Sequence, residues 1–157
     1  MLTRLKRRWN GLRKQRRYYS GKKKRHTVKT QVVARKSDEK IMCLFFGAGR
    51  RHDFRLFKES GVRFARESEV RTDSGYHGLA KIHGNSVLPK RRMRGKELSK
   101  EDKRKNREIS SGRVLNEHIM GRVKRFRILA ERYRNRRKRF GLRFNLIAGI
   151  CNFELAV

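Results

Sequence analysis

The sequence predicts an α/β fold, and three observations carry that prediction. Residues 27–34 and 41–46 are β-branched and apolar runs with the length of neighbouring strands. Residues 54–57 place two phenylalanines at helical spacing, as expected of a short helix after those strands. Residues 106–140 form a long basic block with helical periodicity. Strands that alternate with helices in this way are typical of α/β organisation.

Composition limits the class of protein and its partners. The chain has 157 residues and a formal net charge of +32, with 36% hydrophobic residues, which suits one domain with a small core. A charge this large predicts a polyanionic partner, and nucleic acid fits better than a membrane surface. The two cysteines are far apart, which excludes a zinc ribbon or a disulfide scaffold. The apolar tail, residues 146–157, is too short to span a membrane.

The first half of the chain is expected to begin with a basic tail and continue as two strands. Residues 1–17 contain no Asp or Glu and no strand-like run, so we expect a disordered basic extension. Residues 27–34 then predict a strand, and residues 41–46, IMCLFF, predict a buried strand because the run is continuously apolar.

Short elements are expected in the middle of the chain. Asp53 predicts the N-cap of a short helix that Gly61 ends. Residues 68–72 predict a short strand that ends at Asp73, and residues 79–83 predict one helical turn. Residues 87–88 precede a proline, which predicts an edge strand.

The last third of the chain is expected to be helical. Ser99, followed by Asp102, resembles a helix-capping pair. The block 106–140 predicts one long helix with Glu117 near its apolar side, and Gly141 is expected to end it. Residues 145–152 predict a second, shorter apolar helix.

Two carboxylates suggest a metal site. Asp73 lies at the end of a predicted strand, where open α/β sheets place ligands, and Glu117 lies on the predicted long helix. Oxygen ligands of this kind suit Mg²⁺ or Mn²⁺, and such ions activate water for phosphodiester cleavage. The residues alone leave two alternatives open. Asp73 is often simply a turn residue, and Glu117 often forms an ion pair with Arg113 or Arg122.

Four segments, in this order, resemble the DDE transposases of bacterial insertion sequences, the DDE superfamily endonuclease group. The resemblance extends from residue 18 to the C-terminus. The segments are YYSGKKKRHT at 18–27, HDF at 52–54, RTDSGY at 71–76, and the pattern NR…NEH…GR…K at 106–124.

The resemblance implies an RNase H-like fold and a divalent-metal site, holding Mg²⁺ or Mn²⁺, made of two Asp and one Glu. It implies DNA cleavage and strand transfer at transposon ends, in the bacterial cytoplasm at the nucleoid, with a homodimer in the full-length family. Asp73 matches the second Asp, and Glu117 matches the Glu, so both are expected to be catalytic and metal-binding. His118 lies near the family's site or on its surface. The expected DNA-binding residues are Lys22, Lys23, Lys24, Arg25, Arg122 and Lys124.

One departure from the family limits the predicted function. The family carries its first Asp on a strand just before the 18–27 segment, whereas the first acid here is Asp38. We therefore expect residues 18–157 to form a partial RNase H-like domain that lacks its first, central strand. The chain is then a truncated transposase without activity of its own. The alternatives are a small basic nucleic-acid-binding or ribosome-associated protein, and a fragment completed by another chain that supplies the missing Asp.

Overall fold

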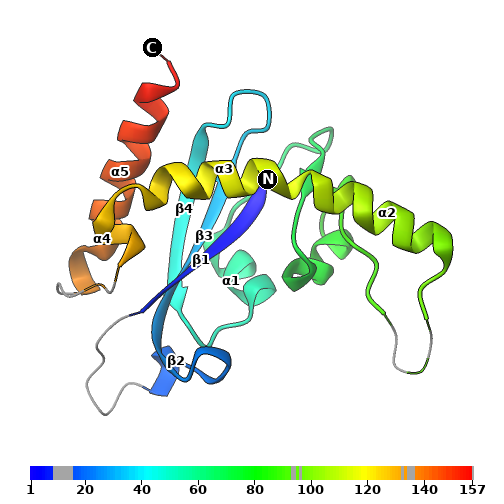
Figure 1. Ribbon diagram of the computed structural model, residues 1–157, viewed down its shortest axis with the longest axis horizontal. Coiled ribbons are helices and arrows are strands. Elements are labelled where there is room, and N and C mark those ends of the chain that lie inside the picture. Colours follow the sequence, from blue (N-terminus) through cyan, green and yellow to red (C-terminus); the bar gives the residue numbers. More distant parts are fainter. Residues whose placement is uncertain (9–15, 93–94, 96, 132, 134–136, 157) are drawn as a thin grey trace.

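The structure is a computed structural model that describes residues 1–8, 16–92, 95, 97–131, 133 and 137–156. Its centre is a β-sheet with helices on both faces (Figure 1). The α/β class predicted from the sequence is confirmed at this level.

The strands form a four-stranded antiparallel sheet and a two-stranded parallel sheet beside it. β1 and β4 both pair antiparallel with β3, one on each side, and β5 pairs parallel with β6. A parallel bridge between Leu2 and Thr72 connects β1 to the end of β5. These pairings give the spatial order β4, β3, β1, β5, β6. The strands are β1 Leu2–Arg8, β2 Tyr19–Ser20, β3 Arg25–Ala34, β4 Ile41–Ala48, β5 Val70–Arg71 and β6 Ser86–Val87.

The first residues of the chain form a central strand, which contradicts two predictions. Residues 1–17 were expected to be a disordered extension, and the central strand was expected to be missing. Instead, β1 pairs with β3 over its whole length, from Leu2 opposite Val33 to Arg8 opposite Thr27. The basic composition hid the strand, because pairing with β3 satisfies the backbone along that edge whatever side chains β1 carries. Residues 9–15 lie outside the described part of the chain.

The helices lie on both faces of the sheet. α1 Asp53–Ser60 follows β4, and the 3-10 segment η3 Ser74–Lys81 follows β5. The later helices are α2 Lys100–Ser111, α3 Arg113–Lys124, α4 Arg127–Ala130 and α5 Phe140–Glu154. Three short 3-10 turns are η1 Arg16–Tyr18, η2 Gly21–Lys23 and η4 Arg137–Arg139. No described helix has the length and apolar character needed to cross a lipid bilayer.

The predicted long helix of residues 106–140 is divided into α2, α3 and α4. α2 begins earlier than expected, after Ser99, whose side-chain oxygen accepts a hydrogen bond from the Asp102 N–H at 3.0 Å as predicted. α2 and α3 meet at Gly112 and cross the molecule as one rod in Figure 1. Phe126 has extended backbone angles and ends the rod, because its side chain packs on the apolar cluster below.

Gly141 was predicted to end a helix, but it lies in the first turn of α5. A Cβ at this position would lie 3.2 Å from the Phe46 ring, so the absence of a side chain lets α5 approach β4 closely. The predicted helix of residues 145–152 is confirmed as the centre of α5.

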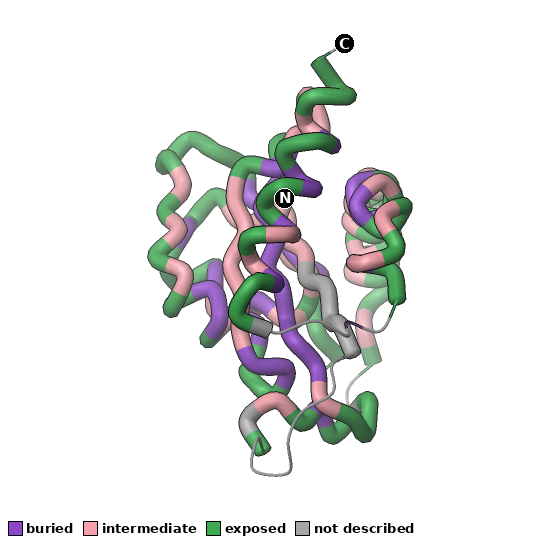
Figure 2. Tube along the Cα trace, turned by 90° about the vertical axis from the view of Figure 1, so that its left-hand side faces the viewer, coloured by how far each residue is buried: buried purple, intermediate pink, exposed green. Residues whose placement is uncertain are grey.

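Apolar side chains are buried on both faces of the sheet. Val28 and Val32 of β3 pack with α3 and α5 on one face, whereas Val33 packs with α1 and η3 on the other. Figure 2 shows the buried residues gathered in the central sheet. The prediction that residues 41–46 form a fully buried strand is wrong. β4 pairs only with β3 among the described strands, and Met42 is 54% exposed.

Candidate active site

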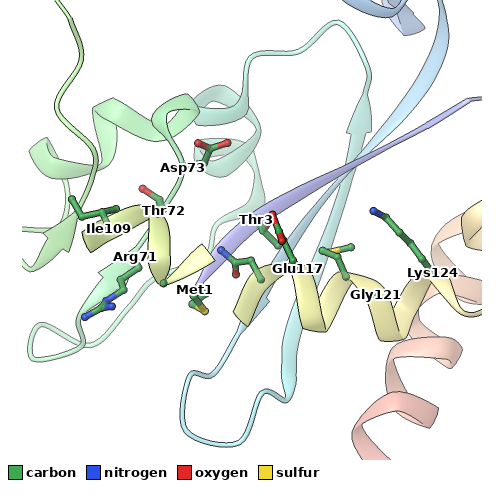
Figure 3. Close-up of a pocket in the computed structure, with 12 residues that line it drawn as sticks. Met1, Thr3, Arg71, Thr72, Asp73, Ile109, Glu117, Gly121 and Lys124 are labelled. Atoms are coloured by element: carbon green, nitrogen blue, oxygen red, sulfur yellow. The ribbon is translucent and has the colours of Figure 1, made fainter. Parts of the chain in front are cut away.

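A pocket opens where the N-terminal end of β1, the end of β5 and the rod of α2 and α3 meet (Figure 3). We call it the carboxylate pocket because Asp73 and Glu117 both line it. The other lining residues are Met1, Thr3, Arg71, Thr72, Ile109, Gly112, Asn116, Met120, Gly121 and Lys124. The pocket thus brings together the two acids that the sequence singled out.

Asp73 enters the pocket from the loop that follows β5. One of its carboxylate oxygens, Oδ1, accepts a hydrogen bond from the Ser74 N–H at 2.7 Å, which orients the side chain at the start of η3. The residue is half-buried. Asp73 is therefore a turn-capping residue and a pocket residue at once, and the first role fixes the carboxylate for the second.

Glu117 enters the pocket from α3. The buried side of this helix anchors it to the sheet. Ile119 is 1% exposed and Val123 is fully buried. Because these side chains hold α3 on the sheet, the side of the helix that carries Glu117 cannot rotate away from the pocket. Glu117 itself is exposed and, within the described part of the chain, makes no hydrogen bond or ion pair. The alternative that it pairs with Arg122 is excluded here, because Arg122 pairs with Glu39 on the β3–β4 turn. The Arg113 side chain lies outside the described part.

Thr3 is the pocket residue that β1 contributes close to Glu117. Figure 3 shows the Thr3 side chain beside the Glu117 carboxylate, with Asp73 further along the same wall. Among the described residues, no group of three His, Cys, Asp or Glu side chains is positioned to hold a metal ion. The residue of β1 that lines the pocket, Thr3, carries a neutral hydroxyl and no carboxylate.

The remaining oxygen atoms of the pocket suit a hard cation. Thr72 Oγ1 and Asn116 Oδ1 are both buried, and neither has a hydrogen-bond partner among the described residues. Both residues line the same wall as the two carboxylates. Carboxylate, amide and hydroxyl oxygens are the ligands that Mg²⁺ and Mn²⁺ prefer. The donor set fits a divalent cation, and two of its members, Asp73 and Glu117, carry negative charge.

The predicted DNA-binding residues are dispersed. Lys124 lines the carboxylate pocket, whereas Arg122 is held by Glu39, and His118 is exposed outside the pocket. The other predicted positions lie around the start of β3, away from the pocket lining. They are Lys23, Lys24 and Arg25, all exposed, and Lys22, whose side chain is outside the described part.

The sequence analysis missed the residues that β1 and the β5 strand end bring to this pocket. Thr3 and Thr72 carry no charge, and they meet only because Leu2 bridges to Thr72 across sixty-nine intervening residues. Thr72 precedes Asp73 and Asn116 precedes Glu117 in the recognised segments, so the motifs could have offered both neutral residues.

Comparison with known proteins gives the family. The family model of the DDE superfamily endonuclease matches residues 3–152. The chain therefore belongs to the DDE superfamily endonuclease family, as the four sequence segments indicated. The match begins within β1, so it includes the strand that the sequence analysis had left out.

A curated relative narrows the likeness to insertion sequences. The chain is 51% identical over 143 residues to a protein of Microchaete diplosiphon described as "Probable transposase for insertion sequence element IS702". The aligned region covers 91% of this chain and 52% of the relative, so the chain spans about half the length of that protein. No solved structure gives a significant match. Nothing in these comparisons supports the alternative of a ribosome-associated protein.

Proposed function

We propose that this chain is the catalytic-domain part of an insertion-sequence transposase, which binds DNA and divalent metal but does not cleave DNA alone. The observation that carries the proposal is the meeting of Asp73 and Glu117 in one pocket from distant parts of the chain. Its net charge of +32 suits a DNA partner, at transposon ends and target, in the bacterial nucleoid.

The order of the strands supports an RNase H-like fold. β1 lies in the middle of the order β4, β3, β1, β5, β6, where the RNase H-like fold places its first strand. Asp73 follows β5, and Glu117 lies on the helix that packs across the sheet. These are the places from which the family's second Asp and its Glu are expected to enter the site.

In the proposed mechanism, Asp73 and Glu117 would hold the metal, and Thr72 and Asn116 line the same pocket. When bound, the metal would activate water and stabilise the charge of a phosphodiester. Lys124, at the same pocket, would attract the phosphate. Thr3 supplies no negative charge. The affinity for the metal would therefore be lower than in a site with a third acid, and the catalytic ligand set would remain incomplete.

Metal titration tests the site. Mn²⁺ binding, followed by water-proton relaxation, is expected to weaken in Asp73→Asn and in Glu117→Gln. The matched control is Glu108→Gln, which removes an exposed acid of α2 that pairs with Arg104 outside the pocket. Equal Mn²⁺ affinity in all four proteins would exclude the proposed metal site.

Plasmid nicking tests the lack of activity. The purified chain with Mg²⁺ or Mn²⁺ is expected to leave supercoiled DNA intact. Nicking by the wild-type chain that disappears in Asp73→Asn would show that the two acids suffice, and the proposed inactivity would then be wrong.

A further inference from the structure

A second pocket lies on the other side of the loop that carries Asp73, and three of the four segments that resemble the family meet there. Ser20 and Gly21 come from the first segment, His52 and Asp53 from the second, and Ser74 and Gly75 from the third. We call it the basic pocket because four Lys or Arg residues also line it: Lys29, Arg50, Arg51 and Arg91. The carboxylate pocket is lined by residues of the third and fourth segments. Of the two pockets, it is the basic pocket that brings the first and second segments together.

The floor of the basic pocket is a buried ion pair. Lys29 Nζ lies 2.7 Å from Asp53 Oδ1, and the two side chains are 3% and 5% exposed. Lys29 also donates a hydrogen bond to the Arg51 carbonyl oxygen. β3 therefore holds the loop between β4 and α1 at two points, and the charge of Asp53 is neutralised before any ligand arrives.

Gly49 fixes the same loop at a third point. Its N–H donates to the Thr27 carbonyl oxygen at 2.9 Å, and a Cβ on Gly49 would lie 1.8 Å from Thr27 Oγ1. The loop thus lies against β3 with no room for a side chain. Arg50 and Arg51 project from a backbone that is already in place, so ordering the loop would cost a ligand little.

The rim of the basic pocket carries uncompensated positive charge. Arg51 pairs with Glu59, but Arg50 and Arg91 are exposed and have no ion pair within the described residues. His77 also lines the pocket, and its Nε2 is buried without a hydrogen-bond partner among the described residues. Exposed arginines around a neutralised floor select an anion, and a phosphodiester oxygen is the anion that DNA presents.

We propose that the basic pocket binds a backbone phosphate of the DNA strand whose neighbouring phosphodiester reaches the carboxylate pocket. Ser74 and Gly75 line the basic pocket and directly follow Asp73, so the two pockets share one wall. A strand held at both pockets would be fixed in register relative to Asp73. The inference rests on the proposed function, because it takes DNA as the ligand.

The test is DNA binding as a function of salt. A fluorescein-labelled DNA duplex is titrated with the whole chain at several NaCl concentrations, and fluorescence anisotropy gives the affinity at each. The pocket variant is Arg50→Gln/Arg91→Gln. The control variant, Arg63→Gln/Arg66→Gln, removes the same charge at two exposed positions outside the pockets. Circular dichroism checks that both variants remain folded.

Loss of the proposed phosphate contact is expected to reduce the slope of log affinity against log salt by about 0.9. The control variant is expected to keep nearly the wild-type slope. Equal losses in both variants, or no loss in the pocket variant, would overturn the basic pocket as a phosphate site while leaving DNA binding intact. If the wild-type chain does not bind the duplex at all, the proposed function itself fails.

Discussion

Asp53 and Asp73 lie at the starts of helical segments, but the structure holds them in opposite ways. Asp53 was predicted to be an N-cap, but it is the first residue of α1 and His52 is the N-cap, whereas Asp73 is the N-cap of η3. Asp53 is buried in the floor of the basic pocket and pairs with Lys29 at 2.7 Å. Asp73 is half-buried in the wall of the carboxylate pocket, where the Ser74 N–H orients it. The two pockets lie on either side of the same loop.

The difference separates an acid that maintains the fold from an acid that can serve a ligand. A buried carboxylate paired with a buried ammonium stabilises the chain only while both partners remain, because an unpaired buried charge is costly. A carboxylate at a pocket wall can bind a cation that enters the pocket. Substitutions in the two regions should therefore affect different measurements: folding stability for Asp53, and metal affinity for Asp73.

The largest expected effect is on the buried pair. Lys29→Met removes the buried cation that pairs with Asp53, and the free energy of unfolding is expected to fall by about 3–5 kcal/mol. Urea unfolding followed by circular dichroism measures the loss. Arg55→Gln serves as the control, since it breaks an exposed pair with Glu59 and should cost about 0–1 kcal/mol. Losses of similar size in the two variants would remove the distinction between the two aspartates.

The loop that carries the basic pocket gives the next effect. Gly49→Ala forces a methyl group against Thr27 and should destabilise the protein by about 1–3 kcal/mol. Gly84→Ala is the matched control, because a Cβ there meets no atom within 4 Å. Its expected change is within about 0.5 kcal/mol. Thermal and urea unfolding compare the two, and an unaffected Gly49→Ala protein would mean that the loop can move away from β3.

The carboxylate pocket can be tested by adding charge. Thr3→Asp places a third acid beside Glu117, and Mn²⁺ affinity is expected to rise about tenfold, which equals about 1.4 kcal/mol. Thr3→Asn, which has a similar shape and no charge, should leave the affinity near its wild-type value. If the two variants bind Mn²⁺ equally, Thr3 does not occupy the place of a ligand.

The smallest expected effect is on the pH dependence of folding stability. It comes from a buried ionisable group that has no buried opposite charge beside it. Burial on α5 raises the pKa of the Cys151 thiol. As the pH rises, the thiol of the folded state therefore keeps its proton to a higher pH than the thiol of the unfolded state, which ionises at about pH 8.5. The stability of the wild type should fall relative to Cys151→Ala as the pH rises through that value. Urea unfolding at neutral and alkaline pH measures the difference, and parallel curves would contradict the prediction.

Local patterns were enough to predict much of the fold. The β-branched residues 27–34 predicted β3, and Ser99 with Asp102 predicted the start of α2. β1 could not be predicted in the same way, because its strand character comes from pairing with β3 and not from its basic side chains. The break at Phe126 likewise depends on tertiary packing, which helical periodicity does not contain.

The sequence predicted the two acids of the carboxylate pocket but not its neutral lining residues. Asp73 and Glu117 follow from chemistry and from the family resemblance, and the structure brings them to one pocket. Thr3 and Thr72 become neighbours of this pocket only through the Leu2–Thr72 bridge, which joins segments far apart in the chain. Arg122 shows the reverse case, since the motif suggested a DNA contact and the structure pairs it with Glu39.

α2 and α3 form one rod, but only α3 is anchored, and this has a consequence for amide hydrogen exchange. α2 has no buried residue, and three of its four ion pairs among the described residues, those with Glu97, Glu101 and Glu108, are exposed on both sides. α3 buries Ile119 and Val123 against the sheet. Amides of α2 should therefore exchange with deuterium through local opening, while those around Glu117 should exchange only with the protein as a whole. α2 can therefore unwind locally while α3, which carries Glu117, stays folded against the sheet.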